Sequence, residues 1–178
     1  MNSTNLKRSW INPKLIISDS KIHGEGVFSN DKIMESEKVM QFGGQLISRE
    51  EAFSGKYRSR SIWMVDDGLF LALPNTDPEP SFDENLNHSC NANTWLIDEA
   101  TIVARRDIEA GEEITLDQGT WNFEDDSYID NKTPCSCGTD DCRHILTNDD
   151  WKLPDVRERY KDHFHPIIQR MIDTDKTL

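Results

Sequence analysis

The sequence predicts a mainly β domain that carries a compact cysteine motif and ends in a helical tail. Short β-branched and apolar runs, separated by turns rich in glycine and aspartate, fill most of the chain up to residue 121. Three of the four cysteines lie between residues 135 and 142, and the signals for longer helices are concentrated after residue 146. Strands do not alternate with helices along the chain, so a sheet built from βαβ units is not expected.

The expected strands are short and are bounded by clear turn signals. Asp66-Asp67-Gly68 is a hairpin turn between two of them, and Asp98-Glu99-Ala100 separates another pair. Ser48 is placed to cap a short helix over residues 49–53. Residues 74–83 are rich in proline and aspartate and are expected to form a loop. The strands are expected over residues 13–18, 38–42, 45–47, 62–65, 69–73, 94–97, 101–104 and 113–116.

The tail has helix signals of its own. Thr147 to Asp150 resembles a capping box, and Pro154 suits a first helical turn. Val156, Tyr160 and Phe164 fall on one helical face, and Pro166 breaks this helix and can begin another. We therefore expect four segments: an N-terminal arm (1–12) docked through Trp10 and Ile11, a main domain (13–121), a linker with the cysteine motif (122–146) and a helical tail (147–178).

The chain is strongly acidic, with 33 Asp and Glu against 20 Lys and Arg and a net charge of −13. Contact with phosphates requires a basic surface, so direct nucleic-acid binding is not expected. The acidity either maintains solubility or attracts a basic partner such as a lysine-rich peptide. No apolar run approaches the ~18 residues of a membrane helix. The first residues also lack the apolar core of a secretion signal, so we expect a soluble intracellular protein, in cytoplasm or nucleus.

The cysteine spacing favours a metal site. Cys135-x-Cys137-x4-Cys142 brings three thiols together, with Gly138 permitting the chain reversal. Cys90 is the remaining cysteine, so a four-cysteine Zn²⁺ site would use every thiol and would be structural. Free thiols, or His144 as fourth ligand, are the alternatives that the spacing leaves open.

Two other motifs have both a structural and a functional interpretation. Gly24 and Gly26 bracket one residue, which suits either an ordinary turn or the close approach of a ligand to the backbone. Asn87-His88 precedes Cys90 and follows the proline-rich loop. The pair is either a locally satisfied buried turn or a recognition site, because asparagine offers both donors and acceptors.

Taken in order, these motifs resemble the SET-domain protein-lysine methyltransferases. HGEGVF at 23–28 is similar to the family's glycine motif, QFGGQLI at 41–47 to its early strand, and NHSCNAN at 87–93 to its NHSCxPN motif. ARRDIEAGEEIT at 104–115 resembles the run before the active-site strand, and CSCGTDDCR at 135–143 resembles the post-SET zinc motif. The resemblance spans about residues 15–146 and makes residues 13–121 the SET domain.

The resemblance implies small curved β-sheets with a pseudoknot, in which the segment after NHSC threads beside the active-site strand. It implies binding of S-adenosylmethionine, and transfer of its methyl group to a lysine amine that enters from the opposite face. Cys90, Cys135, Cys137 and Cys142 would share one structural zinc. The residues that would contact the cofactor are Gly24, Glu25, Gly26, Asn87, His88 and Leu146.

Two positions depart from the family pattern. Glu84 replaces an arginine that is usual three residues before the asparagine of NHSC, and Gln118 occupies the position of the catalytic tyrosine. Tyr128 could substitute for that tyrosine. Trp121 and Phe123 either form the lysine channel or simply pack in the core. The sequence therefore predicts a methyltransferase acting on lysine in a basic protein, or alternatively an impaired SET-like module that binds cofactor or a lysine-bearing peptide. It fixes neither the degree of methylation nor the oligomeric state.

Overall fold

A computed structural model describes residues 6–122 and 132–174, and it is built mainly from short strands. Two four-stranded sheets form the body, with the strand orders β1-β4-β10-β9 and β2-β3-β11-β8. The predicted mainly β fold is confirmed. These strands are β1 (Trp10–Ile11), β2 (Leu15–Asp19), β3 (Glu25–Ser29), β4 (Lys38–Gln41), β8 (Asn87–His88), β9 (Thr94–Leu96), β10 (Thr101–Ala104) and β11 (Glu113–Leu116).

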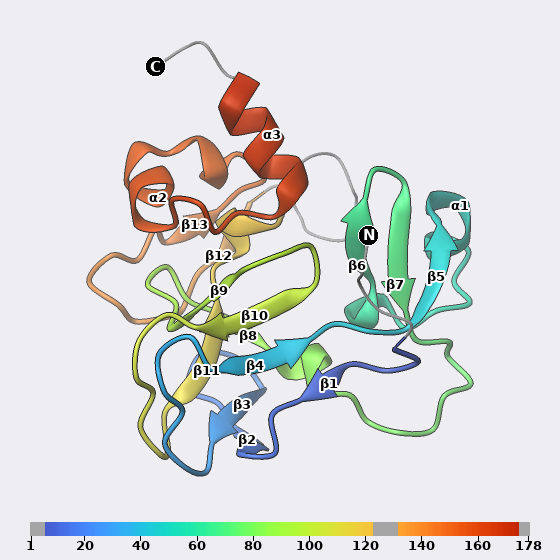
Figure 1. Ribbon diagram of the computed structural model, residues 1–178, viewed down its shortest axis with the longest axis horizontal. Coiled ribbons are helices and arrows are strands. Elements are labelled where there is room, and N and C mark those ends of the chain that lie inside the picture. The colour runs from blue at the N-terminus through green and yellow to red at the C-terminus, as the bar shows by residue number, and fades with distance from the viewer. Residues whose placement is uncertain (1–5, 123–131, 175–178) are drawn as a thin grey trace.

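A third sheet stands to one side of this body (Figure 1). It has the order β5-β7-β6, and Ser48 caps the helix α1 (Arg49–Ala52) that follows β5 in a full capping box with Glu51. Three short 3-10 turns accompany the sheets: η1 (Ser59–Ser61), η2 (Asp83–Asn85) and η3 (Gln118–Thr120). The strands of the third sheet are β5 (Gln45–Ser48), β6 (Trp63–Asp66) and β7 (Leu69–Ala72).

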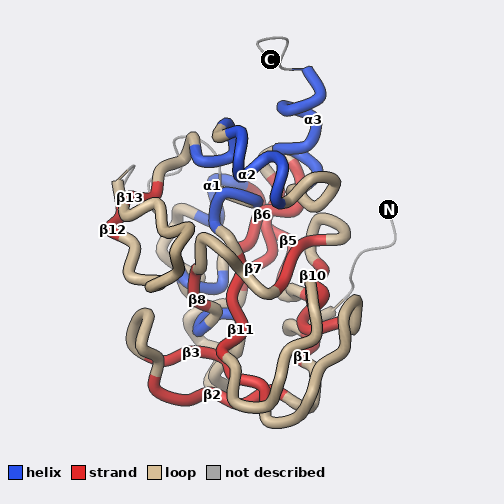
Figure 2. The backbone as a smooth tube through the Cα atoms, turned by 90° about the vertical axis from the view of Figure 1, so that its left-hand side faces the viewer, coloured by secondary structure: helices blue, strands red, loops and turns tan. Residues whose placement is uncertain are grey.

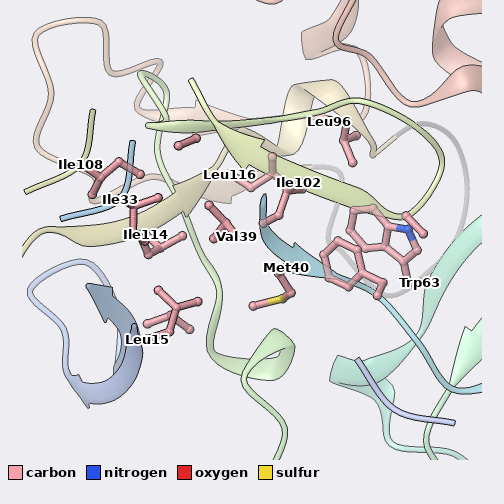
Figure 3. Close-up of a cluster of buried hydrophobic side chains, with 14 of the residues drawn as sticks. Leu15, Ile33, Val39, Met40, Trp63, Leu96, Ile102, Ile108, Ile114 and Leu116 are labelled. Atoms are coloured by element: carbon pink, nitrogen blue, oxygen red, sulfur yellow. The ribbon is translucent and has the colours of Figure 1, made fainter. Parts of the chain in front are cut away.

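The core lies between the sheets and is formed by aliphatic side chains from many strands. Val39, Ile102 and Ile114 come from different strands and are fully buried (Figure 3). Their inward orientation follows from the two-residue period of strands, which places alternate side chains on the core face. Phe42 stacks on Trp63 at this core with ring centroids 3.7 Å apart, so the core extends toward the third sheet.

β11 crosses the centre of the molecule and makes the least local of the strand pairings (Figure 2). It runs antiparallel to β3 and parallel to the short β8, with Thr115 opposite Asn87. Asn93 extends this ladder with its side chain, because its Nδ2 donates to Glu113 O at 2.8 Å and its Oδ1 accepts from Thr115 N at 2.9 Å. The segment after Cys90 is thereby fastened against β11.

The tail differs from the single-face helix expected from the sequence. Helix α2 (Pro154–Arg159) ends before Tyr160, and the chain turns at Asp162, whose φ is +66°. Tyr160 and Phe164 are buried with Val156 even so, because the turn returns them to the same apolar cluster. The remaining elements are β12 (Thr133–Pro134), β13 (Ile145–Leu146), η4 (Asp150–Lys152) and α3 (Pro166–Thr174).

The tail packs beside the body, as Figure 1 shows for α2 and α3. The hydroxyl of Tyr160 accepts a hydrogen bond from Ala92 N at 3.0 Å, which ties the tail to the segment after NHSC. Trp10 and Ile11 form β1 and pair with β4, so these two residues lie on the sheet. Within residues 6–122 and 132–174, the helices are too short and too polar to cross a membrane.

Candidate functional site

A cavity of about 380 Å³ opens at the carboxyl end of β11. Its walls are largely apolar and aromatic, and most of its polar groups come from the turns η1, η2 and η3. Such a cavity, with a few convergent polar groups, is the usual form of a small-ligand site. The residues that matter most for its chemistry are Phe42, Arg60, Trp63, Asp83, Glu84, His88, Leu116, Gln118 and Trp121.

Gln118 begins η3 directly after β11 and lines this cavity. Its backbone N–H donates to His88 Nδ1 at 3.0 Å, and Asp117 caps the turn by accepting from Gly119 N at 2.8 Å. The side chain is only 7% exposed, and its Nε2 has no hydrogen-bond partner among the described residues. The position that the resemblance assigns to a tyrosine is therefore a buried amide with an unused donor.

His88 connects this position to the cysteines. Burial lowers the pKa of His88 to about 4, against the opposing effect of Asp117, so the imidazole is neutral near pH 7. Because Nδ1 accepts the Gln118 N–H, the ring proton lies on Nε2, which is 3.3 Å from Cys90 Sγ. His88 also lines the cavity. One imidazole thus fixes the end of β11 relative to the thiol cluster.

Asn87 holds the glycine motif in place. Its Nδ2 lies 3.1 Å from both His23 O and Glu25 O, and 2.7 Å from Glu113 Oε1. A Cβ built on Gly26 would lie 2.3 Å from Glu113 Oε1, so any larger residue would displace the Glu113 carboxylate from this network. The side-chain amide of Asn87 therefore has a structural role, and the contact with a cofactor that the resemblance implies remains a prediction.

The four cysteines come together although Cys90 is distant in sequence. The Sγ atoms of Cys90, Cys135, Cys137 and Cys142 all lie within 4.8 Å of one another, and those of Cys90 and Cys135 are 3.8 Å apart. Tetrahedral zinc with Zn–S bonds of about 2.3 Å requires sulfurs about 3.8 Å apart, so the spacing fits this ion. His144 is not part of the group, which leaves Cys90 as the fourth thiol.

Three of the thiols differ in pKa because their surroundings differ. Burial raises the pKa of Cys90 and, to about 11, that of Cys135. Burial acts on Cys137 in the same direction, but hydrogen bonds led by that from the Thr139 hydroxyl lower its pKa to about 6. A thiolate is therefore available near neutral pH, and a bound metal ion would favour the thiolate form of all four.

An ion cluster beside the thiols was not anticipated from the sequence. Arg143 follows Cys142 and donates to both carboxylate oxygens of Asp117, at 2.6 and 2.9 Å. Its Nε donates to Asp150 at 2.8 Å, and its backbone N–H donates to Cys90 Sγ at 3.3 Å. Asp117 is fully buried, and Arg143 compensates its charge. Arg143 therefore links the cysteine motif directly to Asp117, the residue that precedes Gln118.

The other predicted site residues fall in different places. Trp121 lines the cavity and lies 5.0 Å from Trp63 between ring centroids, so it is both a wall and a packing residue. Leu146 is buried in β13, opposite Thr133, and its contact with a cofactor stays a prediction. Phe123 and Tyr128 lie outside the described residues. Among the described residues, tyrosine is absent from the cavity wall.

The sequence interpretation passed over several residues of this site. Asp83 was assigned to a loop, Trp63 to an ordinary strand, and Glu84 was noted only as a departure from the family pattern. The structure places all three at the cavity. The available signal was the acidic pair Asp83-Glu84, which is separated from NHSC by two residues, because Glu84 stands where the family usually has an arginine.

Comparison with known proteins gives a consistent result. A family model described as SET domain matches residues 24–119, which is more than half of the chain. Among curated proteins, the Drosophila virilis histone-lysine N-methyltransferase trithorax is 31% identical over 71% of this chain and 3% of its own length. The Homo sapiens histone-lysine N-methyltransferase 2B is 31% identical over 71% of this chain and 5% of its own length.

A third relative, the H3 lysine-36-specific histone-lysine N-methyltransferase of Debaryomyces hansenii, is 28% identical over 76% of this chain and 19% of its own length. The chain thus spans only a small part of these relatives. Among solved structures, KRYPTONITE, in complex with mCHG DNA and SAH, has a TM-score of 0.56 at 20% identity, covering 74% of this chain and 28% of that chain. This likeness supports the fold alone. With its ordered motifs, its parallel β8–β11 pairing and the matched residues 24–119, the chain belongs to the SET-domain family.

Proposed function

We propose that the chain is an S-adenosylmethionine-dependent protein-lysine N-methyltransferase. The observation that carries the proposal is the largely apolar cavity at the end of β11, lined by Trp63, Trp121 and Gln118. It lies beside His88, at the end of the strand that the resemblance to the SET family identifies as the active-site strand. Aromatic and aliphatic walls suit the four-carbon stem of a lysine.

The residues of the cavity provide what methyl transfer requires. A lysine amine must be neutral to attack, and an apolar cavity lowers its pKa because burial disfavours the ammonium form. Gln118 can orient the amine by accepting a hydrogen bond through its amide oxygen. When bound, S-adenosylmethionine supplies an electrophilic methyl group on a sulfonium. Holding the amine in line with that group is the main contribution of the protein.

The cofactor would be held by the glycine motif and the NHSC motif. No atom lies within 4 Å of a Cβ built on Gly24, whose φ is +49°, so the backbone there is open to a ligand. Because the Nδ2 of Asn87 is occupied by His23, Glu25 and Glu113, Asn87 would contact the cofactor through its other atoms. The other proposed cofactor residues are Glu25, Gly26, His88 and Leu146. Cys90, Cys135, Cys137 and Cys142 would hold one structural Zn²⁺.

The substrate is proposed to be a lysine in a basic protein. The relatives are named as histone-lysine methyltransferases, and a basic tail would complement the net charge of −13. Purified protein containing zinc is incubated with methyl-labelled cofactor and with core histones. We expect label in lysine of at least one histone. Absence of incorporation, in protein that binds S-adenosylhomocysteine by calorimetry, would contradict the proposal.

Gln118 supports a second candidate, an impaired SET-like module that binds cofactor or a lysine-bearing peptide. An amide lacks the phenol hydroxyl of the expected tyrosine, and loss of one positioned polar group typically lowers a rate by about 10²–10³-fold. The Gln118→Tyr variant separates the two. Activity in the wild type that this variant raises only modestly supports the enzyme. Activity that is found only in Gln118→Tyr supports the impaired module.

A further inference from the structure

Buried polar atoms without partners are concentrated at the cavity. Four buried side-chain nitrogen or oxygen atoms have no hydrogen-bond partner within the described part of the chain, and three belong to residues that line the cavity. These are Asp83 Oδ1, Glu84 Oε1 and Gln118 Nε2; the fourth belongs to Gln169 in α3. Buried polar groups are almost always paired, so this concentration indicates a ligand that completes them.

Each of the two carboxylates is anchored through one of its oxygens. Arg58 Nη2 donates to Glu84 Oε2 at 2.8 Å, and Ser9 Oγ donates to Asp83 Oδ2 at 2.7 Å. The second oxygen of each carboxylate is the unpartnered one. Rotation about the terminal torsion of a carboxylate is soft, so a small adjustment presents these oxygens to the cavity. The site therefore has two acceptors in advance of any ligand.

The chemistry of the cavity selects the ligand. Two carboxylate acceptors favour a cation with several donors, and a primary ammonium has three. Trp63, Trp121 and Leu116 would contact an aliphatic stem. A 180° rotation of the Gln118 amide exchanges its nitrogen and oxygen and would give a third acceptor. Divalent metal ions such as Ca²⁺ require six or more oxygen ligands, which this largely apolar cavity does not offer.

We propose that Asp83 and Glu84 form the acceptor pair for the ammonium group of the lysine that enters the cavity. Recognition of the amine is then carried by carboxylates before the NHSC motif, where the family resemblance would assign it to a phenol. The inference rests on the proposed function for the identity of the amine, but it concerns binding of the ammonium form, which comes before the loss of the proton that methyl transfer requires. Burial raises the pKa of Glu84, with Arg58 and Arg60 opposing, and a bound ammonium would further stabilise the charged carboxylate.

The test measures binding of a small lysine probe by NMR. Nα-acetyl-lysine N-methylamide is titrated into the zinc-loaded protein, and the indole signals of Trp63 and Trp121 report binding. Its neutral isostere, the norleucine amide, is titrated in parallel. Glu84→Gln and Asp83→Asn preserve shape and keep an oxygen that can accept a hydrogen bond from Arg58 or Ser9, while removing the charge of the carboxylate. We expect each to weaken lysine binding by about tenfold and to leave norleucine binding unchanged.

Glu50→Gln is the matched control, because Glu50 is an exposed carboxylate in α1, outside the residues that line the cavity. It should bind the lysine probe like the wild type. Unchanged lysine affinity in both cavity variants would overturn the proposal, as would equal affinity of the wild type for lysine and norleucine. A loss confined to S-adenosylhomocysteine binding would also overturn it, since the pair would then serve the cofactor.

The outcomes separate this inference from the proposed function. Lysine binding that depends on Glu84, without any methyl transfer, would leave the inference standing and remove the enzyme. Methyl transfer together with lysine binding that does not depend on these charges would support the enzyme and contradict the inference. Thermal unfolding of each variant shows whether it folds. Asp83→Asn provides the test if loss of the Arg58–Glu84 pair prevents Glu84→Gln from folding.

Discussion

Asp117 and Gln118 are neighbours in the chain, but they lie in opposite environments. Asp117 is fully buried, and its carboxylate accepts hydrogen bonds from Arg143 and Gly119. Gln118 is nearly as buried, yet its Nε2 has no partner among the described residues. At the end of β11, the hydrogen-bonding groups of the Asp117 carboxylate are therefore satisfied and are linked to the cysteine motif through Arg143. The amide of Gln118, at the cavity, still has a donor without a partner. Ligand sites commonly combine a rigid support with unsatisfied groups that the ligand completes.

Removal of zinc from the four-cysteine site, on the Asp117 side, should have the largest effect on stability. Structural zinc binds thiolate sites with about 10–16 kcal/mol in small peptides, so much of the order around residues 133–146 depends on it. We expect about one zinc per chain by elemental analysis, and a fall in the thermal midpoint with a strong chelator. Cys135→Ser should lower the zinc content, whereas Ser136→Ala, at an exposed position between two ligands, should not. Full zinc content in Cys135→Ser would contradict the four-cysteine site.

Arg143→Met tests the ion cluster itself. The substitution keeps the side-chain volume but leaves Asp117 and Asp150 as buried, uncompensated carboxylates. We expect the free energy of unfolding, measured with urea at saturating zinc, to fall by about 3–5 kcal/mol. Arg106→Met removes an exposed pair with Glu112 and should cost less than about 1 kcal/mol. Similar losses of unfolding free energy in the two variants would show that the buried ion cluster does not stabilise the fold more than an exposed pair does.

His165 tests how the cavity side responds to pH. It is buried, donates its backbone N–H to Thr120 O, and has Nε2 3.1 Å from Met64 O beside the cavity. Burial lowers its pKa from 6.5 to about 4. As pH falls through this range, the unfolded state binds a proton that the folded state excludes, so the free energy of unfolding falls. Above the range both states are neutral, and below it both are protonated.

Burial also lowers the pKa of His88, so this residue adds a pH dependence of the same sign. The difference between wild type and His165→Gln therefore isolates the contribution of His165. We expect the wild type to lose about 1–3 kcal/mol more than the variant between neutral pH and the folded pKa, measured by urea unfolding at several pH values. His23→Gln, at an exposed position, should keep the wild-type profile. Parallel profiles for wild type and His165→Gln would exclude the buried neutral histidine as the cause.

Gln118→Met gives the smallest expected effect, and one of opposite sign. Methionine has a similar length and removes the unpartnered amide, so the free energy of unfolding should rise by up to about 1 kcal/mol. Asn87→Leu, at an amide with three acceptors, should instead destabilise. Urea unfolding of both variants compares the two regions directly. A destabilised Gln118→Met protein would mean that this amide is already satisfied.

Local sequence patterns predicted most of the elements that surround the site. The hairpin turn at Asp66-Asp67-Gly68, the capping role of Ser48 and the strand before Gln118 all depend on residues a few positions apart, and the structure contains each of them. The tail is the exception. Helical periodicity placed Val156, Tyr160 and Phe164 on one helix, but the turn at Asp162 achieves the same burial without helical continuity. A pattern of apolar residues predicts which side chains are buried more reliably than it predicts the course of the backbone between them.

By itself, the sequence determined the SET-domain family, the cysteines able to share a metal ion, and the replacement of a tyrosine by Gln118. These follow from residue types at fixed spacing, which the sequence displays directly. Only the tertiary structure decided that Arg143 neutralises Asp117, 26 residues away, and that Asp83 and Glu84 share a cavity with Gln118. Such contacts depend on how β11 is threaded between β3 and β8, a long-range pairing that no local pattern encodes.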